Sequence, residues 1–206
     1  MSGEASHKLI ILTCIVISII SLLYVLYSYK TNTTSQKPSS TPPVAFANQT
    51  QPTTDVESSD GKFKLSMLET KEKSDIVYTF SVLNEDTGSA TRILSKTVSL
   101  DTTMSIPLNS FSPDDKYVFL KETTGDQNSY WVLTSSGANL TNDSQTEEIS
   151  SVFMAKYQNY KITDVTGWGG MNLIVINTDK TEGGIGPSFW FEVPSKAIIP
   201  LSNRFN

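Results

Sequence analysis

Three tryptophans and a run of glycines are the residues of this sequence whose chemistry points most directly to ligand binding. Trp168 stands in the tetrapeptide Gly-Trp-Gly-Gly at 167–170, where small neighbours leave an indole ring free to stack on a flat ligand such as a sugar ring. The sequence therefore predicts a ligand-binding site at Trp168, Gly169, Gly170, Trp131 and Trp190. The alternative is a glycine-rich strand bend beside a core tryptophan.

Carboxylates are the other side chains whose pairing suggests chemistry. Asp114 and Asp115 follow a proline, where an aspartate ordinarily caps its own turn rather than binding calcium. Glu147 and Glu148 are interpreted as a solvated acidic pair in a polar loop. Glycosidases use two carboxyl groups about 5 to 10 Å apart, so a membrane-anchored, carboxylate-dependent hydrolase acting on cell-envelope polysaccharide is the alternative function.

Two further motifs lack the residues that their chemistry needs. The glycine-rich segment 178–187 has neither the Lys-Ser or Lys-Thr pair nor the following helix of a phosphate-binding loop, so it is predicted to be a hairpin connection. No Ser-x-x-Lys motif is placed at the start of a helix, as it is in penicillin-binding proteins.

The scarce residues exclude several kinds of active site. The single histidine, His7, and the single cysteine, Cys14, both lie in the N-terminal region. The remaining chain can build no Ser-His-Asp triad, no histidine-ligated metal site, no thiol nucleophile and no disulfide. We therefore predict no catalytic residue, no metal and no cofactor.

The charge of the C-terminal segment argues against a polyanionic partner. Residues 60–206 contain 13 lysines and arginines against 18 aspartates and glutamates, which gives −5, equal to the formal charge of the whole chain. Nucleic acids are bound through clustered basic side chains, so no nucleic-acid partner is predicted.

An uncharged run from Leu9 to Tyr29 is predicted to be a transmembrane helix. At 1.5 Å per residue it reaches about 30 Å, the thickness of the bilayer hydrocarbon. Thr13 precedes Cys14 and the apolar run continues beyond it, which excludes a lipoprotein signal, and no small-x-small cleavage site follows closely. We expect a cell-membrane signal anchor, with residues 1–8 in the cytoplasm and the C-terminal part outside it.

Residues 30–59 are predicted to form a flexible linker rich in serine, threonine and proline, because they have too few apolar side chains to fold. The alternatives are a peptide ligand around Pro42-Pro43 and glycosylation at Asn32 or Asn48, which requires a eukaryotic secretory lumen.

From residue 60 onward, alternation of apolar and polar residues between turn signals predicts β-strands and no convincing helix. The expected strands are 63–69, 76–84, 92–100, 116–122, 130–135, 160–166, 173–178, 188–193 and 197–201.

One stretch has a more specific pattern. Phe-Ser-Pro-Asp-Asp-Lys-Tyr-Val-Phe-Leu at 111–120, followed by Tyr-Trp-Val-Leu-Thr-Ser-Ser-Gly at 130–137, resembles one blade of the TolB-type β-propeller repeat, which is related to WD repeats. Asp115 replaces the glycine usual in that turn. Residues 59–63 and 78–88 are similar to a preceding unit, and a degenerate third unit begins at Tyr160.

The resemblance implies an all-β domain at 60–206, a propeller-like array of about three antiparallel blades. Closed propellers need at least four blades, so either the third unit is something else, or the array stays open, or copies combine between chains as a homo-oligomer. The predicted function is non-catalytic: a single-pass membrane protein that presents this domain for protein or glycan binding. An architectural subunit with β edges completed by another chain is a third possibility.

Overall fold

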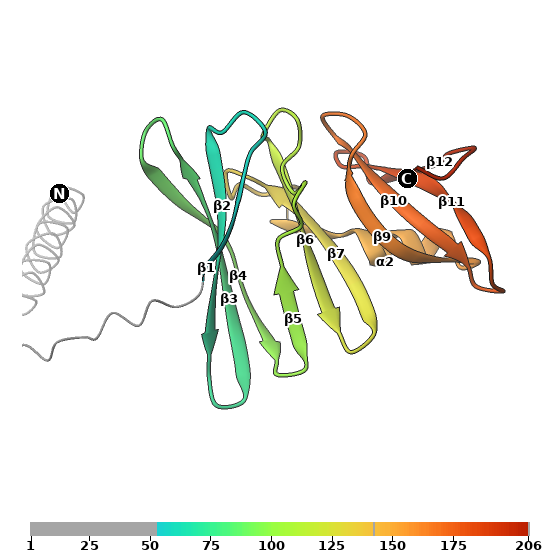
Figure 1. The fold of residues 1–206 in the computed structure, drawn as a ribbon, viewed down its shortest axis with the longest axis horizontal. Coiled ribbons are helices and arrows are strands. Elements are labelled where there is room, and N and C mark those ends of the chain that lie inside the picture. The colour runs from blue at the N-terminus through green and yellow to red at the C-terminus, as the bar shows by residue number, and fades with distance from the viewer. Residues whose placement is uncertain (1–52, 142, 206) are drawn as a thin grey trace, which may run out of the picture. The chain divides into compact units, whose positions relative to one another are not determined.

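The computed structural model describes residues 53–141 and 143–205, all within one compact unit that spans residues 49–206. The described chain contains twelve β-strands and one short helix, so the prediction of an all-β domain is confirmed. The strands form three antiparallel sheets of four strands each, which lie side by side in chain order (Figure 1).

Each sheet is a meander, in which strands that are consecutive in the sequence are neighbours in the sheet. The first sheet contains β1 (Thr53–Glu57), β2 (Phe63–Lys71), β3 (Asp75–Asn84) and β4 (Ser89–Ser99). The second contains β5 (Thr102–Ser105), β6 (Tyr117–Thr124), β7 (Gln127–Thr134) and β8 (Thr146–Glu148). The third contains β9 (Tyr160–Trp168), β10 (Leu173–Lys180), β11 (Ile185–Glu192) and β12 (Ala197–Pro200), and α2 (Ile149–Lys156) precedes it.

Two hydrophobic cores hold the three sheets together. The first core joins the first and second sheets, and the second core joins the second sheet, α2 and the third sheet. Strand β6 contributes Val118 and Leu120 to the first core, and Tyr117 and Phe119 to the second. Successive side chains of a strand point to opposite faces, so the second sheet is buried on both sides.

Polar contacts occur on the outward faces of the two end sheets. Ser66 and Ser81 pair across β2 and β3 on the outward face of the first sheet, where they are half-buried. On the third sheet, the Arg204 guanidinium donates to Asp179 Oδ1 at 2.9 Å, and the Phe205 N–H donates to Ser188 Oγ at 2.8 Å. The C-terminal segment is thus fastened to β10 and β11.

Three strands were not predicted from the sequence. β1 lies inside residues 30–59, so the predicted linker is wrong for its last part: residues 53–57 pair with β2, and Val56 packs on the first core. β5 and β8 are only four and three residues long and mostly polar, which leaves little alternation to recognise. The nine predicted strands all occur, most with extended ends.

The prediction that the domain has no helix is wrong. α2 buries Ile149 and Phe153, one helical turn apart, in the second core. It has only eight residues, and Glu148 at its N-cap makes no side-chain capping bond. The usual start signal of a helix is therefore missing from the sequence.

The predicted tail (1–8), membrane anchor (9–29) and most of the linker lie outside the described residues. Within 53–141 and 143–205, no helix has the length and apolarity to cross a membrane.

A hydrogen-bonded turn leads into β2. The Ser58 hydroxyl donates to Asp60 Oδ1 at 2.9 Å and accepts from the Phe63 N–H at 3.0 Å, while the Ser58 N–H donates to the Phe63 carbonyl at 2.7 Å. Gly61 has a φ of +73°, in the left-handed region that glycine enters without strain.

The same turn leads into β6. The Ser112 hydroxyl donates to Asp114 Oδ1 at 2.7 Å and accepts from the Tyr117 N–H at 3.0 Å, and the Ser112 N–H donates to the Tyr117 carbonyl at 2.9 Å. The position of Gly61 is taken by Asp115, with a φ of +56°. The first and second sheets are therefore entered through equivalent turns.

Candidate functional site

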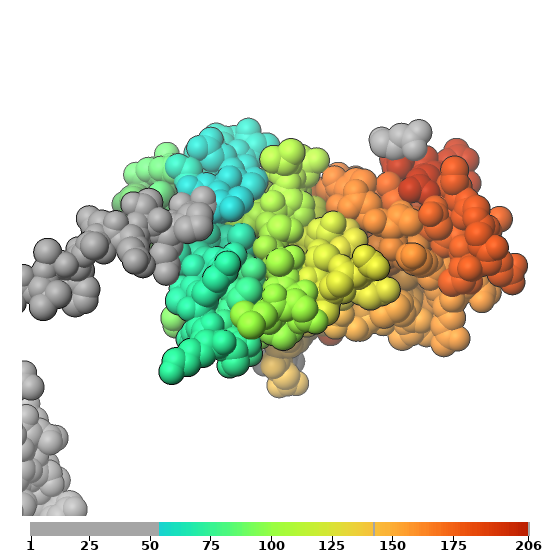
Figure 2. Space-filling model, turned by 60° about the horizontal axis from the view of Figure 1, so that its bottom comes forward, coloured from blue at the N-terminus to red at the C-terminus, as the bar shows by residue number. Residues whose placement is uncertain are grey.

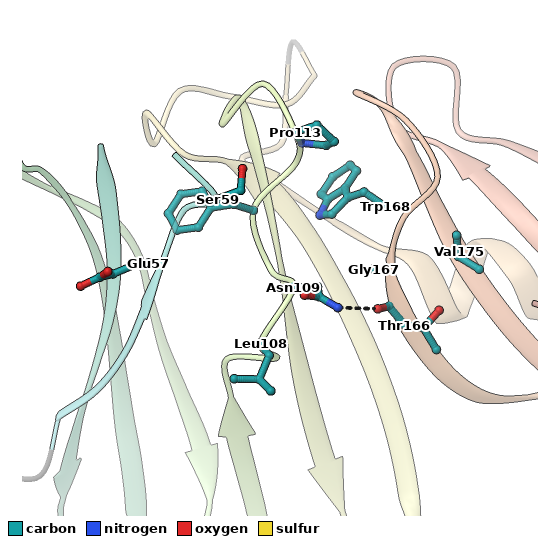
Figure 3. A pocket seen from close by; sticks show the side chains of 10 residues that line it. Glu57, Ser59, Leu108, Asn109, Pro113, Thr166, Gly167, Trp168 and Val175 are labelled. Atoms are coloured by element: carbon teal, nitrogen blue, oxygen red, sulfur yellow. Dashed lines mark hydrogen bonds between the residues drawn. The ribbon is translucent and has the colours of Figure 1, made fainter. Parts of the chain in front are cut away.

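A pocket of about 490 Å³ opens where segments of all three sheets meet (Figure 3). It is lined by the end of β1 and the turn after it, the connection between β5 and β6, the end of β9, and one residue of β10. These residues are Glu57, Ser59, Leu108, Asn109, Phe111, Pro113, Thr166, Gly167, Trp168 and Val175. We call it the Trp168 pocket.

The pocket lies at the edge where each sheet begins. β1, β5 and β9 are the first strands of their sheets, and each is an edge strand. The pocket is lined by residues of β1, of β9 and of the chain that directly follows β5. The meander topology therefore brings the three pieces together although they are far apart in the sequence.

Trp168 is held in a fixed orientation. Its Nε1 donates to the Ser110 carbonyl at 3.1 Å. Its ring lies 6.2 Å from the Tyr117 ring at an interplanar angle of 19°, and 6.1 Å from the Phe119 ring at 58°. The indole is half-buried, with one part against the second core and another part in the pocket. The interpretation of Trp168 as a core tryptophan therefore holds for one part of the side chain, and the other part lines the pocket.

The β5–β6 connection is fastened to β9 at the pocket. Asn109 Nδ2 donates to the Thr166 carbonyl at 3.3 Å (Figure 3). Leu108, beside it, is 86% exposed, the highest value among the large exposed hydrophobic residues of the described chain. The pocket therefore has an apolar side chain at its rim and polar backbone and amide groups in its wall.

The pocket has a single carboxylate among its lining residues, Glu57. Its side chain is 66% exposed and lies 3.7 Å from Lys64 Nζ. Two hydroxyl side chains, Ser59 and Thr166, complete the polar lining. The arrangement suits hydrogen bonding to a neutral polar ligand rather than acid–base chemistry by two facing carboxyl groups.

A smaller pocket of about 370 Å³ continues from the first and shares Leu108, Asn109 and Thr166 with it. Its wall includes Tyr130, whose hydroxyl donates to Asp164 Oδ1 at 3.1 Å. Burial raises the pKa of Tyr130 above its ordinary value, so the phenol remains a hydrogen-bond donor across the physiological range.

The three tryptophans predicted to share a ligand-binding site do not lie together in the structure. Trp131 on β7 packs on the first core, and Lys96 Nζ lies 3.6 Å from the centre of its ring. Trp190 lies on β11, opposite Val175 and Ile199 in the strand ladders. Only Trp168 of the three lines the pocket.

Gly169 and Gly170 follow the pocket rather than line it. A Cβ on Gly169 would come within 2.7 Å of Trp190 Nε1, so this glycine lets the chain pass over the indole. A Cβ on Gly170 would make only ordinary contacts, the nearest 3.6 Å from Leu173. Gly169 therefore has a packing role at Trp190, and Gly170 has none there.

The other sequence candidates are mostly structural. The prediction that Asp114 caps its own turn is confirmed, because it accepts hydrogen bonds from Ser112 Oγ and from the Lys116 N–H. The interpretation of Glu147 as a solvated loop residue is wrong: it lies in β8, is half-buried, and its carboxylate pairs with Lys196 Nζ at 2.5 Å. The glycine-rich segment forms the β10–β11 hairpin as predicted. No cluster of metal-ligating side chains occurs in the described part of the chain.

The turns beside the pocket contain one strongly perturbed pair of acids. Burial and the facing Asp60 carboxylate raise the pKa of Asp115 to about 6. Hydrogen bonds from Lys62 and Ser58 hold the pKa of Asp60 well below its usual range. The sequence indicates only a turn role for Asp115, because the two acids are far apart in the chain.

The sequence matches no protein-family model and no curated protein sequence.

Proposed function

We propose that this chain is a single-pass membrane protein that presents a three-bladed β domain outside the cytoplasm and binds a glycan non-catalytically through the Trp168 pocket. The observation that carries the proposal is the pocket itself, with a fixed, half-buried indole surrounded by hydroxyl, amide and carboxylate groups. Aromatic rings with a few convergent polar groups are the usual lining of small-ligand sites.

The propeller-like character of the domain rests on two observations. Three four-stranded meanders pack face to face, as blades do in propellers. The equivalent turns before β2 and β6 match the TolB-type resemblance of residues 59–63 and 111–120. A pocket lined by β1, by β9 and by the chain that follows β5 then corresponds to the inner edge of an open propeller.

The membrane location rests on the sequence. The uncharged run at 9–29 is the only segment long enough to span the hydrocarbon layer, and residues 30–52 give the domain room to stand away from the lipid. An extracytoplasmic glycan is the ligand class most consistent with this location and with a lining of hydroxyl and amide groups beside one exposed carboxylate.

The hydrolase alternative receives less support. It requires two acids facing each other about 5 to 10 Å apart beside Trp168, whereas the pocket has Glu57 alone. Proteins remain the second class of ligand, and the binding experiment separates them from glycans.

The test is binding by the full-length chain, purified in detergent micelles, to glycan arrays and to immobilised cell-envelope extract with or without prior protease treatment. We expect binding to at least one glycan class, and retention in protease-treated extract. Binding that disappears after protease treatment, with no glycan bound, would show a protein ligand instead. No binding in either format would contradict the proposal.

Two variants connect binding to the pocket. Trp168→Ala should abolish glycan binding, and Asn109→Ala, at an exposed position, should weaken it without disturbing the core. Trp131→Phe is the control, because Trp131 packs on the first core and does not line the pocket. Circular dichroism confirms that each variant is folded. Equal binding by Trp168→Ala and Trp131→Phe would place the ligand elsewhere.

A further inference from the structure

A larger pocket lies where β7 and β9 begin, and α2 forms part of its wall. Its volume is about 710 Å³, and it shares no lining residue with the Trp168 pocket. Figure 2, which turns this end of the sheets toward the reader, shows the yellow surface of β7 beside the orange surface of the segment that follows. We call it the β7–β9 pocket.

The β7–β9 pocket runs along the edges of two strands. Four consecutive residues line it on each side, 126–129 at the start of β7 and 160–163 at the start of β9. Successive side chains of a strand point to opposite faces, so a pocket over the face of a sheet contacts every second residue. Contact with consecutive residues therefore indicates that the pocket follows the strand edges, where main-chain groups are accessible.

The start of β7 has an open edge because β8 is short. β8 pairs only with residues 131–133, and the chain then turns into α2. The Tyr130 N–H donates to Ser150 Oγ at 3.0 Å, so Tyr130 directs its main-chain groups away from β6. Asn128, two residues earlier, directs its own N–H and carbonyl to the same side. Within residues 53–141 and 143–205, no group bonds to either of them.

The start of β9 has a second open edge, since β9 is the terminal strand of its sheet. The Thr181 N–H donates to the Asn159 carbonyl at 3.0 Å, so the main-chain groups of the next residue, Tyr160, face away from β10. The Tyr160 N–H donates to the Tyr157 carbonyl at 3.2 Å. The Tyr160 carbonyl and the Ile162 N–H, on the same side, have no partner in the described part of the chain.

The side chains around these open edges favour a neutral ligand with apolar groups. Met154 of α2, which lines the pocket, is 56% exposed. Asp126 and Lys161 are the only charged lining residues, and their charges are opposite. Open strand edges are usually protected by charged residues or proline, but residues 127–129 contain neither.

We propose that the β7–β9 pocket binds an extended peptide of a partner protein. The main chain of the peptide pairs with the open groups of Asn128, Tyr160 and Ile162, and an apolar side chain of the peptide contacts Met154. An extended chain presents a donor and an acceptor on one side at every second residue, which is the spacing of the open groups on β9. A sugar chain has no such repeat of donors and acceptors.

This peptide site is separate from the proposed glycan site. Farther along β9, Asn109 Nδ2 donates to the Thr166 carbonyl at 3.3 Å, which closes the strand edge before the Trp168 pocket. The inference therefore goes beyond the proposed function and does not depend on it.

The test is selection from a phage library of random short peptides against the full-length chain in detergent micelles. We expect selected sequences that bind as synthetic peptides, measured by fluorescence polarisation. N-methylation of alternate peptide amides removes their main-chain N–H groups and should weaken binding about tenfold. Peptides that tolerate N-methylation at every position, or a selection that yields no binder, would overturn the proposal.

Asn128→Pro tests the open edge of β7. Proline removes the unbonded N–H and leaves the ladder to β6 intact, so peptide affinity should fall about tenfold. Asn128→Ala is the matched control, because it retains the N–H and should change affinity by less than about threefold. Circular dichroism confirms that both variants are folded.

Met154→Ala tests the apolar wall and should weaken peptide binding about threefold to tenfold. Met171→Ala is its matched control, since Met171 is also exposed, at 65%, and does not line the pocket. Wild-type affinity in both Asn128→Pro and Met154→Ala would show that the peptides bind elsewhere and would overturn the proposal.

The Trp168→Ala variant separates the two proposals. It should bind the selected peptides as the wild type does, whereas its glycan binding should be lost. Loss of peptide binding in Trp168→Ala alone would move the peptides to the Trp168 pocket. An array glycan that loses affinity for Met154→Ala but not for Trp168→Ala would assign the β7–β9 pocket to a glycan instead. A failure of the chain to bind any glycan would leave the peptide result standing.

Discussion

Gly186 is the glycine of the third sheet whose replacement should be least tolerated. It lies buried in β11, where an added Cβ would come within 3.0 Å of the Thr178 carbonyl oxygen and closer still to the Thr178 hydroxyl. That hydroxyl already donates to the Pro187 carbonyl at 2.7 Å. Because backbone cannot move aside, we expect Gly186→Ala to lower the free energy of unfolding by about 1–3 kcal/mol, measured by urea denaturation.

Gly170→Ala is the matched control for this substitution. Its added Cβ would make ordinary van der Waals contact with Leu173, so the unfolding free energy should change by less than about 0.5 kcal/mol. Equal losses in the two variants would contradict the packing argument.

For single residues, the sequence predicts the chemistry of a side chain better than it predicts which other side chains lie beside it. The replacement of a turn glycine by Asp115 is visible in the sequence, and the structure places that residue at a φ of +56°. The pocket was only partly predictable: Trp168 was recognised from its glycine neighbours, but Glu57 and Asn109 belong to other sheets. Nothing in their local sequence indicates that they meet Trp168.

Among the elements, α2 makes a testable contribution to the second core. Phe153 is fully buried and meets Phe189 edge to face, with ring centres 5.0 Å apart and planes at 81°. Removal of the ring would leave a cavity between α2 and β11, so Phe153→Ala should cost about 3–5 kcal/mol. Urea unfolding provides the measurement.

Met154, the next residue of the helix, supplies the comparison. It is 56% exposed, and Met154→Ala should change stability by less than about 0.5 kcal/mol. If Met154→Ala proves as harmful as Phe153→Ala, the helix would not be anchored through its phenylalanine.

Elements were predictable where apolar and polar residues alternate over a sufficient length. β3 buries Ile76, Tyr78, Phe80 and Val82 at every second position, which is the signal that the sequence displays. β5, with Thr-Thr-Met-Ser, and β8, with Thr-Glu-Glu, have no comparable pattern and form because longer neighbours pair with them. β1 likewise forms because it pairs with β2.

The whole molecule should partition with membranes. We expect the full-length chain to sediment with the membrane fraction and to enter solution only with detergent, because residues 9–29 are uncharged and predicted to span the bilayer. Deletion of residues 9–29 should transfer the protein to the aqueous fraction. Deletion of residues 31–51, a segment of equal length, should leave it in the membrane. Recovery of the full-length chain in the aqueous fraction without detergent would contradict the anchor.

Both faces of the second sheet are covered by neighbouring elements. Tyr117, Phe119, Tyr130 and Val132 need α2 and the third sheet as neighbours, just as Val118 and Leu120 need the first. A nascent chain synthesised only as far as Glu148 would expose these four large side chains of the second sheet to solvent. Such an intermediate would be prone to aggregation. The side chains are covered once α2 and the third sheet have been synthesised and have packed against them.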